Sequence, residues 1–209
     1  MVYTKLRVKF ERVGTLRFIS HLDLCRAIRT IFRRAKLPIR YSEGFNPHPR
    51  MTFTLPLPLG AESECEYMDI FLPEGYDLST VCPDMNAVSP VGLRFLEAYL
   101  PESSLSDVMY SRYDLHLFGI TAAEAQAILD NPPALKKKNK KGVEKVVDIA
   151  PMIHDGVAED ADGGAFVTVT LDAGDASYLN PDRFASVFGA EDYRLRRTAL
   201  YFADGREFR

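Results

Sequence analysis

The sequence predicts an α+β protein made of two tandem ferredoxin-like units, each a split βαβ arrangement with an antiparallel sheet. Two observations lead to this prediction. Segments in which apolar and polar residues alternate are separated by segments with helical periodicity, and the order strand, helix, strand, strand, helix, strand occurs twice. A length of 209 residues also suits two domains of about 100 residues each. We therefore expect one unit over residues 1–106 and a second unit over residues 107–209.

The first strand and the first helix have clear signatures. Residues 5–12 alternate, and their apolar positions are Leu6, Val8 and Phe10. A short strand-like piece, TLRFI, follows Gly14, and the segment SHLDLCRAIRTIFRRAKLP then has helical periodicity. Ser20 stands three residues before Asp23, as in a capping box, and Pro38 marks the end of the helix.

This helix is amphipathic. Its apolar face comprises Leu24, Ile28, Ile31 and Ala35, with Phe32 beside them. The opposite face carries an arginine stripe, which we define as Arg26, Arg29 and Arg33. The helix is therefore expected to bury one side and to present arginines on the other.

The rest of the first unit follows the same pattern of elements. The segments RMTFTLPL and CEYMDIFL are predicted strands joined by PLGAESE. A helical segment near residues 78–85 and a strand at GLRFLEAYL complete the unit.

The second unit repeats this order. VMYSRYDLHLFG is a predicted strand, and TAAEAQAILDN is a helix that begins at Thr121 with Glu124 three residues later. VEKVVDIAPMI and GAFVTVTLDA are predicted strands, and we interpret HDGVAEDADGG between them as a solvent-exposed hairpin loop. NPDRFASVFG is a helix with Pro181 just inside its start and Gly189 past its end, and YRLRRTALYF is the last strand.

The composition restricts the class of protein. No run of about 18 apolar residues occurs, and the N-terminal segment MVYTKLRVKFERVG lacks the apolar core of a signal peptide. We therefore expect a cytoplasmic protein without a membrane segment. The cysteines Cys25, Cys65 and Cys82 fit neither a disulfide framework nor a Cys-x-x-Cys metal site. Reduced thiols, no metal site and no cofactor in this chain are expected.

Charge is segregated along the chain. Residues 1–60 contain twelve Lys or Arg residues and three acids, a net charge of +9. Residues 61–108 contain one Arg and ten acids, a net charge of −9. A basic face of this kind most often meets a polyanion. The alternative is that the two blocks neutralise one another across paired strands.

Two blocks of sequence, FISHLDL and YSEGFNPHP followed by PLPLG, resemble the radical SAM-linked protein family. This is a bacterial domain of unknown function that occurs alone or fused behind a cobalamin-binding radical SAM enzyme. The resemblance covers residues 3 to about 203, with a weaker block at KKGVEKVVDIAPMI. It implies a radical SAM partner and an association with genes for RNA processing and ribosome maturation.

The sequence lacks the motifs of several classes of enzyme. A radical SAM centre needs three closely spaced cysteines for its iron–sulfur cluster, and the three cysteines are far apart. The sequence also lacks a phosphate-binding Gly-rich loop with Lys and a Ser nucleophile elbow. His116 and His154 are expected to be structural or solvated, which leaves His21 and His48 as candidates for chemistry.

The main functional hypothesis is a non-catalytic accessory module that binds RNA and presents it to the radical SAM enzyme. Arginines would neutralise phosphates, Tyr41 and Phe45 would stack on unpaired bases, and Asn46 and His48 would contact base edges. We expect Phe45 and Pro47 to anchor the loop while Asn46, His48 and Arg50 face outward. The predicted phosphate-binding residues are Arg17, Arg26, Arg29, Arg33, Arg34, Arg40 and Arg50.

Two alternatives remain open. The chain could be a metal-independent endoribonuclease resembling the CRISPR repeat-processing nucleases, with His21 as general acid or base and Tyr41 or His48 nearby. On the helical wheel His21 lies nearer the apolar face than the arginine face. This position favours a structural role for His21, packed under the sheet. The other alternative is a protein-only scaffold that docks on the radical SAM enzyme through acidic residues, namely Glu62, Glu64, Glu66 and Asp69.

Overall fold

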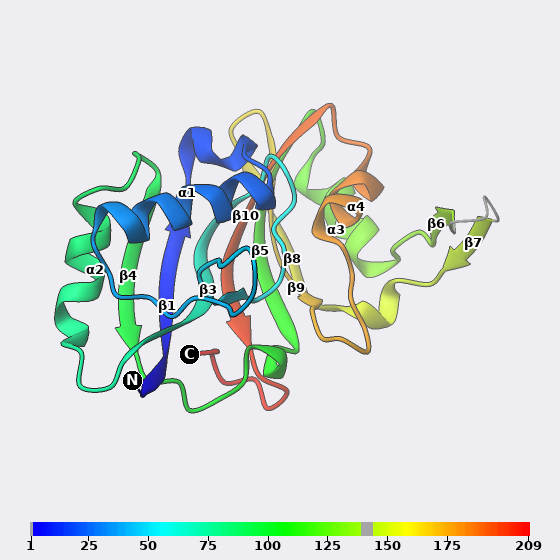
Figure 1. The fold of residues 1–209 in the computed structure, drawn as a ribbon. Coiled ribbons are helices and arrows are strands. Elements are labelled where there is room, and N and C mark those ends of the chain that lie inside the picture. The colour runs from blue at the N-terminus through cyan, green and yellow to red at the C-terminus, as the bar shows by residue number, and fades with distance from the viewer. Residues whose placement is uncertain (1, 139–143) are drawn as a thin grey trace. The chain divides into compact units, whose positions relative to one another are not determined.

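The computed structural model describes residues 2–138 and 144–209, which belong to two α+β units. The first unit comprises Met1–Asp107 together with Arg209, and the second comprises Val108–Phe208. Figure 1 gives the labels of the helices and strands. Among the described residues, no helix is both long enough and apolar enough to span a membrane.

In the first unit, two helices pack on one face of a four-stranded antiparallel sheet. The strand order is β4-β1-β3-β2, and every neighbouring pair is antiparallel. Its elements are β1 (Tyr3–Arg12), the 3-10 helix η1 (Gly14–Phe18), α1 (His21–Arg34), β2 (Met51–Phe53), β3 (Glu62–Pro73), α2 (Leu78–Asn86), β4 (Leu93–Tyr99) and the 3-10 helix η2 (Leu105–Asp107).

The core of this unit lies where the sequence pattern predicts it. Leu6, Val8 and Phe10 of β1 are buried at 1%, 0% and 0% exposure, and they pack against the apolar face of α1. That face buries Leu24, Ile28, Ile31 and Phe32. Helix α1 begins as expected, because the Ser20 side chain accepts a hydrogen bond from the backbone N–H of Asp23 at 3.1 Å.

Two local predictions for this unit were wrong. TLRFI forms part of η1 instead of a strand. The strand predicted over RMTFTLPL is only Met51–Phe53, because prolines at 56 and 58 cannot donate ladder hydrogen bonds. Arg7 of β1 is completely buried, and the strand register places it opposite Asp69.

In the second unit, strand, helix, strand, strand, helix and strand follow in the same order as in the first, with β6 and β7 added after the first helix. The strand order is β10-β5-β9-β8, and all neighbouring pairs are antiparallel. Its elements are β5 (Tyr110–Phe118), α3 (Ala122–Asp130), β6 (Leu135–Lys138), β7 (Glu144–Val147), η3 (Ala150–Met152), β8 (Ile153–Ala161), β9 (Gly164–Asp172), α4 (Pro181–Ala185), η4 (Ser186–Phe188) and β10 (Asp192–Tyr201). Within the described residues, β6 and β7 pair with one another and with no other strand.

The helix ends of this unit agree with their sequence signals. Thr121 and Glu124 form a complete capping box at the start of α3. The pKa of Glu124 is lowered by the hydrogen bonds that its carboxylate accepts from the backbone and side chain of Thr121. Pro181 is the first residue of α4, and Gly189 ends η4 with a left-handed φ of 62°.

The segment HDGVAEDADGG was wrongly predicted to be a loop. Most of it belongs to β8, which pairs with β9 along one side only. An edge strand with a solvated face needs few apolar residues, so charged side chains hid its periodicity. The strand predicted at VEKVVDIAPMI is divided between β7, η3 and the first residue of β8, and its first residue, Val143, lies outside the described residues.

Candidate functional site

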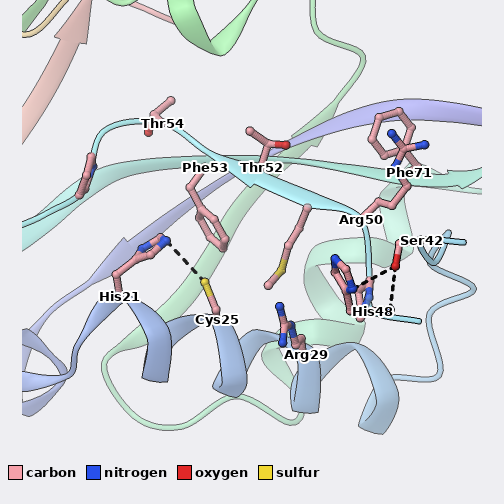
Figure 2. Close-up of a pocket in the computed structure, with 13 residues that line it drawn as sticks. His21, Cys25, Arg29, Ser42, His48, Arg50, Thr52, Phe53, Thr54 and Phe71 are labelled. Carbon is pink, nitrogen blue, oxygen red and sulfur yellow. Dashed lines mark hydrogen bonds between the residues drawn. The ribbon is translucent and has the colours of Figure 1, made fainter. Parts of the chain in front are cut away.

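The first unit contains a cavity of about 530 Å³. It lies between α1, the segment 42–50, and the segment 51–56, which begins with β2. Figure 2 shows His21, Cys25 and Arg29 along α1, facing Phe53 of β2, with Ser42 and His48 beside them. The full lining comprises His21, Cys25, Arg29, Ser42, His48, Pro49, Arg50, Met51, Thr52, Phe53, Thr54, Pro56 and Phe71.

Helix α1 provides one wall. His21, Cys25 and Arg29 are spaced four residues apart, and this spacing places them on one side of a helix. The His21 ring lies edge-on to Phe53, with 5.2 Å between ring centroids, and its Nε2 is 3.6 Å from the Cys25 sulfur. Burial raises the pKa of the Cys25 thiol, which therefore stays protonated near neutral pH and is a poor nucleophile.

The segment 41–50 provides the opposite wall through a closed loop. A backbone bridge between Tyr41 and Pro49 closes its neck, and the Ser42 N–H donates to the His48 carbonyl at 2.8 Å. The Ser42 hydroxyl accepts from the His48 backbone N–H at 3.1 Å and lies 3.0 Å from His48 Nδ1. These contacts hold the His48 ring at the edge of the cavity.

The cavity is positively charged. Arg29 and Arg50 are exposed, and no carboxylate forms an ion pair with either of them within the described part of the chain. The Arg50 guanidinium lies over the ring of Phe71, 5.4 Å from its centroid. None of the described residues that line the cavity is acidic. Such a site favours an anionic ligand, because two cations face the same solvent-filled space.

The structure brings four of the predicted site residues into this cavity, namely His21, Arg29, His48 and Arg50. His21 is exposed and is not packed under the sheet. The arginine stripe is also exposed, but Arg26 pairs with Asp23 at 2.8 Å. The remaining predicted residues do not line the cavity, namely Arg17, Arg26, Arg33, Arg34, Arg40, Tyr41, Phe45 and Asn46.

The expected anchoring of the loop by Phe45 and Pro47 is wrong. Phe45 has a relative exposure of 109%, and Pro47 is exposed as well. Asn46, His48 and Arg50 are exposed, as predicted. Backbone and Ser42 hydrogen bonds shape this loop, so its aromatic ring is not needed for packing.

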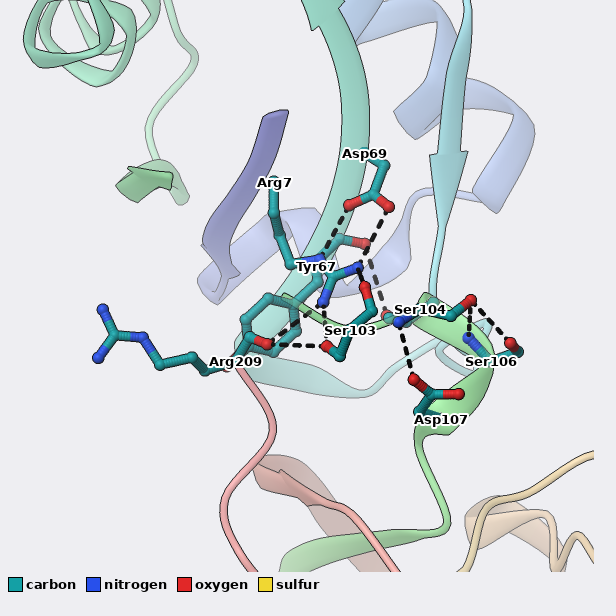
Figure 3. A network of polar contacts seen from close by, with 9 residues as sticks. Arg7, Tyr67, Asp69, Ser103, Ser104, Ser106, Asp107 and Arg209 are labelled. Atoms are coloured by element: carbon teal, nitrogen blue, oxygen red, sulfur yellow. Dashed lines mark hydrogen bonds and ion pairs between the residues drawn. The ribbon is translucent and has the colours of Figure 1, made fainter. Parts of the chain in front are cut away.

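Two of the four acidic residues expected to dock a partner are buried. Glu66 and Asp69 each have 5% exposure, and Figure 3 shows the Asp69 carboxylate paired with Arg7. Glu62 accepts a hydrogen bond from the backbone N–H of Gly14 and lies 3.9 Å from Arg17. Arg7 and Arg17 belong to the basic block and their partners to the acidic block, so the two blocks neutralise one another in part.

Sequence reasoning did not single out several residues of the cavity, namely Cys25, Ser42, Thr52, Phe53 and Thr54. The helical spacing of Cys25 from His21 and Arg29 was an available signal. No sequence signal marked Ser42, Thr52, Phe53 or Thr54, because only loop closure and strand pairing bring them to the cavity. Among the described residues, no cluster of three or more His, Cys, Asp or Glu side chains could hold a metal ion.

Comparison with protein families matches residues 5–181 to a family described as "Uncharacterized protein conserved in bacteria (DUF2344)". The match includes all of α1, the loop at 41–50 and every residue that lines the cavity. No curated protein matches the chain.

Proposed function

The chain belongs to this bacterial family, DUF2344, and we propose that it is an RNA-binding module that presents RNA to a radical SAM enzyme and catalyses no reaction alone. The main support is the cavity of the first unit, where Arg29 and Arg50 lack acidic partners among the described residues and His21 and His48 stand beside them. Phosphate groups attract unpaired arginines, and imidazole and hydroxyl groups supply further hydrogen bonds.

We also propose that both units are ferredoxin-like. The order of elements and the strand orders β4-β1-β3-β2 and β10-β5-β9-β8 support this assignment, because they are equivalent when the strands are numbered within each unit. The β6-β7 hairpin would then be an insertion between the first helix and the second strand of the second unit.

The test of RNA binding uses the double variant Arg29→Ala, Arg50→Ala and a fluorescent single-stranded RNA of twelve nucleotides. If both arginines contact phosphates, affinity falls and the slope of log K against log salt becomes shallower by about 1.4, as the loss of two contacts to a single strand requires. Thermal unfolding should change little, because both side chains are exposed.

The matched control is the double variant Arg94→Ala, Arg183→Ala, which removes the same charge from exposed positions on β4 and α4. It should bind the RNA as the unmodified chain does. Equal losses in the two double variants would mean that net charge alone attracts RNA. Absence of binding by the unmodified chain at low salt would refute the proposed function.

The radical SAM partner is proposed from the resemblance of the FISHLDL and YSEGFNPHP blocks. The chain, tagged and purified from its bacterial host with and without ribonuclease treatment, should retain a radical SAM protein identified by mass spectrometry. Its recovery in both samples would indicate a protein contact, whereas recovery only without ribonuclease would indicate an RNA bridge. Failure to recover such a protein in either sample would contradict this part of the proposal.

A second candidate function, metal-independent RNA cleavage, is favoured by one observation. His21 and His48 line the same cavity as Arg29 and Arg50, and an acid, a base and cations are the groups that such cleavage uses. The same RNA and protein, incubated together and analysed for RNA length, test this second candidate function. RNA that is cut in the presence of EDTA by the unmodified chain, and is left intact by His21→Ala, would favour the nuclease over the non-catalytic module.

A further inference from the structure

Phe45 is the most exposed large apolar side chain described in the structure, with a relative exposure of 109%. The ring is surrounded by water, although burial of a Phe side chain would be favourable. Phe45 therefore contributes little to the packing of the folded chain. An exposed aromatic ring on an ordered loop beside a cationic site is the arrangement on which unpaired bases stack.

The loop is ordered by its own hydrogen bonds. Besides the neck between Tyr41 and Pro49, the Nδ1 atom of His48 lies 3.2 Å from the Asn46 carbonyl oxygen and 3.0 Å from the Ser42 hydroxyl. Gly44 has a φ of 123°, a conformation that other residues rarely adopt. The ring is thus presented on a preorganised loop, which reduces the entropy lost when a ligand binds.

The same hydrogen bonds connect this loop to the cavity. Ser42 and His48, which close the loop, both line the cavity. Phe45 is three residues from His48, so their Cα atoms are at most about 11 Å apart. Arg50 follows His48 by two residues in the chain and also lines the cavity. A ligand longer than this distance can contact both the cavity and the loop tip that carries Phe45.

The chemistry of the neighbourhood points to a nucleic acid strand. Two arginines without acidic partners among the described residues favour phosphate, and an exposed ring next to a phosphate site suits a nucleobase. The one acid within the loop sequence 42–48 is Glu43. The alternative ligand is a protein with an apolar groove. It would bury the Phe45 ring but would supply no anion for Arg29 and Arg50.

We propose that Phe45 stacks on an unpaired base while Arg29 and Arg50 hold the phosphate next to it, so that the first unit selects single-stranded over double-stranded RNA. This inference rests on the proposed function and adds the class of RNA. Bases within a duplex are already paired and stacked, and their faces are not available to a side chain. Duplex RNA is thus expected to contact the arginines alone.

The chain contains no Trp, so Phe45→Trp supplies a unique fluorescent reporter at this position. Stacking of a base on the new indole ring should quench its emission when a single-stranded RNA of twelve nucleotides is added. The same strand annealed to its full complement, as a blunt-ended duplex, should leave the emission nearly unchanged. An oligonucleotide with the same phosphates but abasic sugars should also fail to quench.

Two truncations measure the contribution of the ring. Phe45→Ala and Phe45→Leu should both weaken binding to the single strand about tenfold, because stacking is worth about 1–3 kcal/mol per base. Both variants should bind the blunt-ended duplex within about twofold of the unmodified chain. Phe18→Ala, which removes another exposed Phe of the first unit, is the matched control and should change neither affinity.

The outcomes separate this inference from the proposed function. If Phe45→Ala keeps full affinity for the single strand while Arg29→Ala, Arg50→Ala loses it, RNA binding stands and the stacking role is refuted. If Phe45→Leu binds the single strand as well as the unmodified chain, the ring acts as an apolar contact and the inference is equally refuted. If the unmodified chain binds neither RNA, both proposals fail.

Discussion

Replacing Asp69 by Asn is expected to lower the free energy of unfolding of the first unit by about 3–5 kcal/mol, because it leaves the buried Arg7 guanidinium without its counter-charge. Arg7 has 0% exposure, and its Nε and Nη2 atoms donate to the two carboxylate oxygens of Asp69 at 2.9 and 3.2 Å. Further bonds run from Arg7 to the Ser103 hydroxyl and carbonyl and to the Arg209 carbonyl (Figure 3). Asn keeps the shape of Asp but supplies no charge.

The measurement is urea-induced unfolding together with hydrogen exchange of the β1 and β3 amides, which reports on the first unit. The double variant Arg7→Met, Asp69→Met should lose less than Asp69→Asn, because it removes both buried charges. Asp204→Asn is the control, since it breaks an exposed pair with Arg206 and should have little effect. A loss below about 1 kcal/mol for Asp69→Asn would contradict the role of this pair.

Replacing Phe10 by Ala is expected to cost about 3–5 kcal/mol in the free energy of unfolding, because it opens a cavity in the core of the first unit. Phe10 is fully buried, and its ring lies 6.3 Å from the ring of Phe53 and 5.8 Å from that of Phe95. Phe53 also contacts the ring of His21, so Phe10 packs behind a residue that lines the candidate site. The same variant should therefore weaken RNA binding at temperatures where it remains folded.

Phe10→Leu separates volume from aromatic contact. It keeps most of the apolar volume and should cost less than about 1.5 kcal/mol in urea-induced unfolding. Phe18→Ala, at an exposed position on η1, should change stability by no more than about 0.5 kcal/mol. Similar stabilities for Phe10→Ala and Phe18→Ala would show that the core of the first unit does not depend on this aromatic cluster.

Most regular elements could be predicted from local sequence patterns. The alternation of Leu6, Val8 and Phe10 predicted β1, and the Ser20 and Thr121 caps predicted the starts of α1 and α3. These features succeeded because a strand or a helix end is encoded within a few neighbouring residues. Strand β8 was missed because an edge strand with a solvated face carries little apolar periodicity.

The candidate site was predictable only in part. The spacing of the arginine stripe identified Arg29, and the composition of the loop at 41–50 identified His48 and Arg50. Their arrangement with His21 around one cavity depends on how β2 pairs with β3 and on how the neck of the loop closes. Phe45 was expected to pack inward, since hydrophobicity alone does not tell whether a loop residue has a pocket to fill.

The sequence by itself determined most of the helices and strands, the buried face of α1, the exposed arginine stripe and the segregation of charge. Each of these is a property of composition or of short-range periodicity. The tertiary structure decided that Arg7 is buried, that His21 and His48 share a cavity and that Phe45 stands in water. Arg7 and Asp69 are 62 residues apart in the chain and meet only through the register of β1 and β3. Strand register and loop closure join residues that are distant in sequence, so these contacts could not be predicted from local sequence patterns.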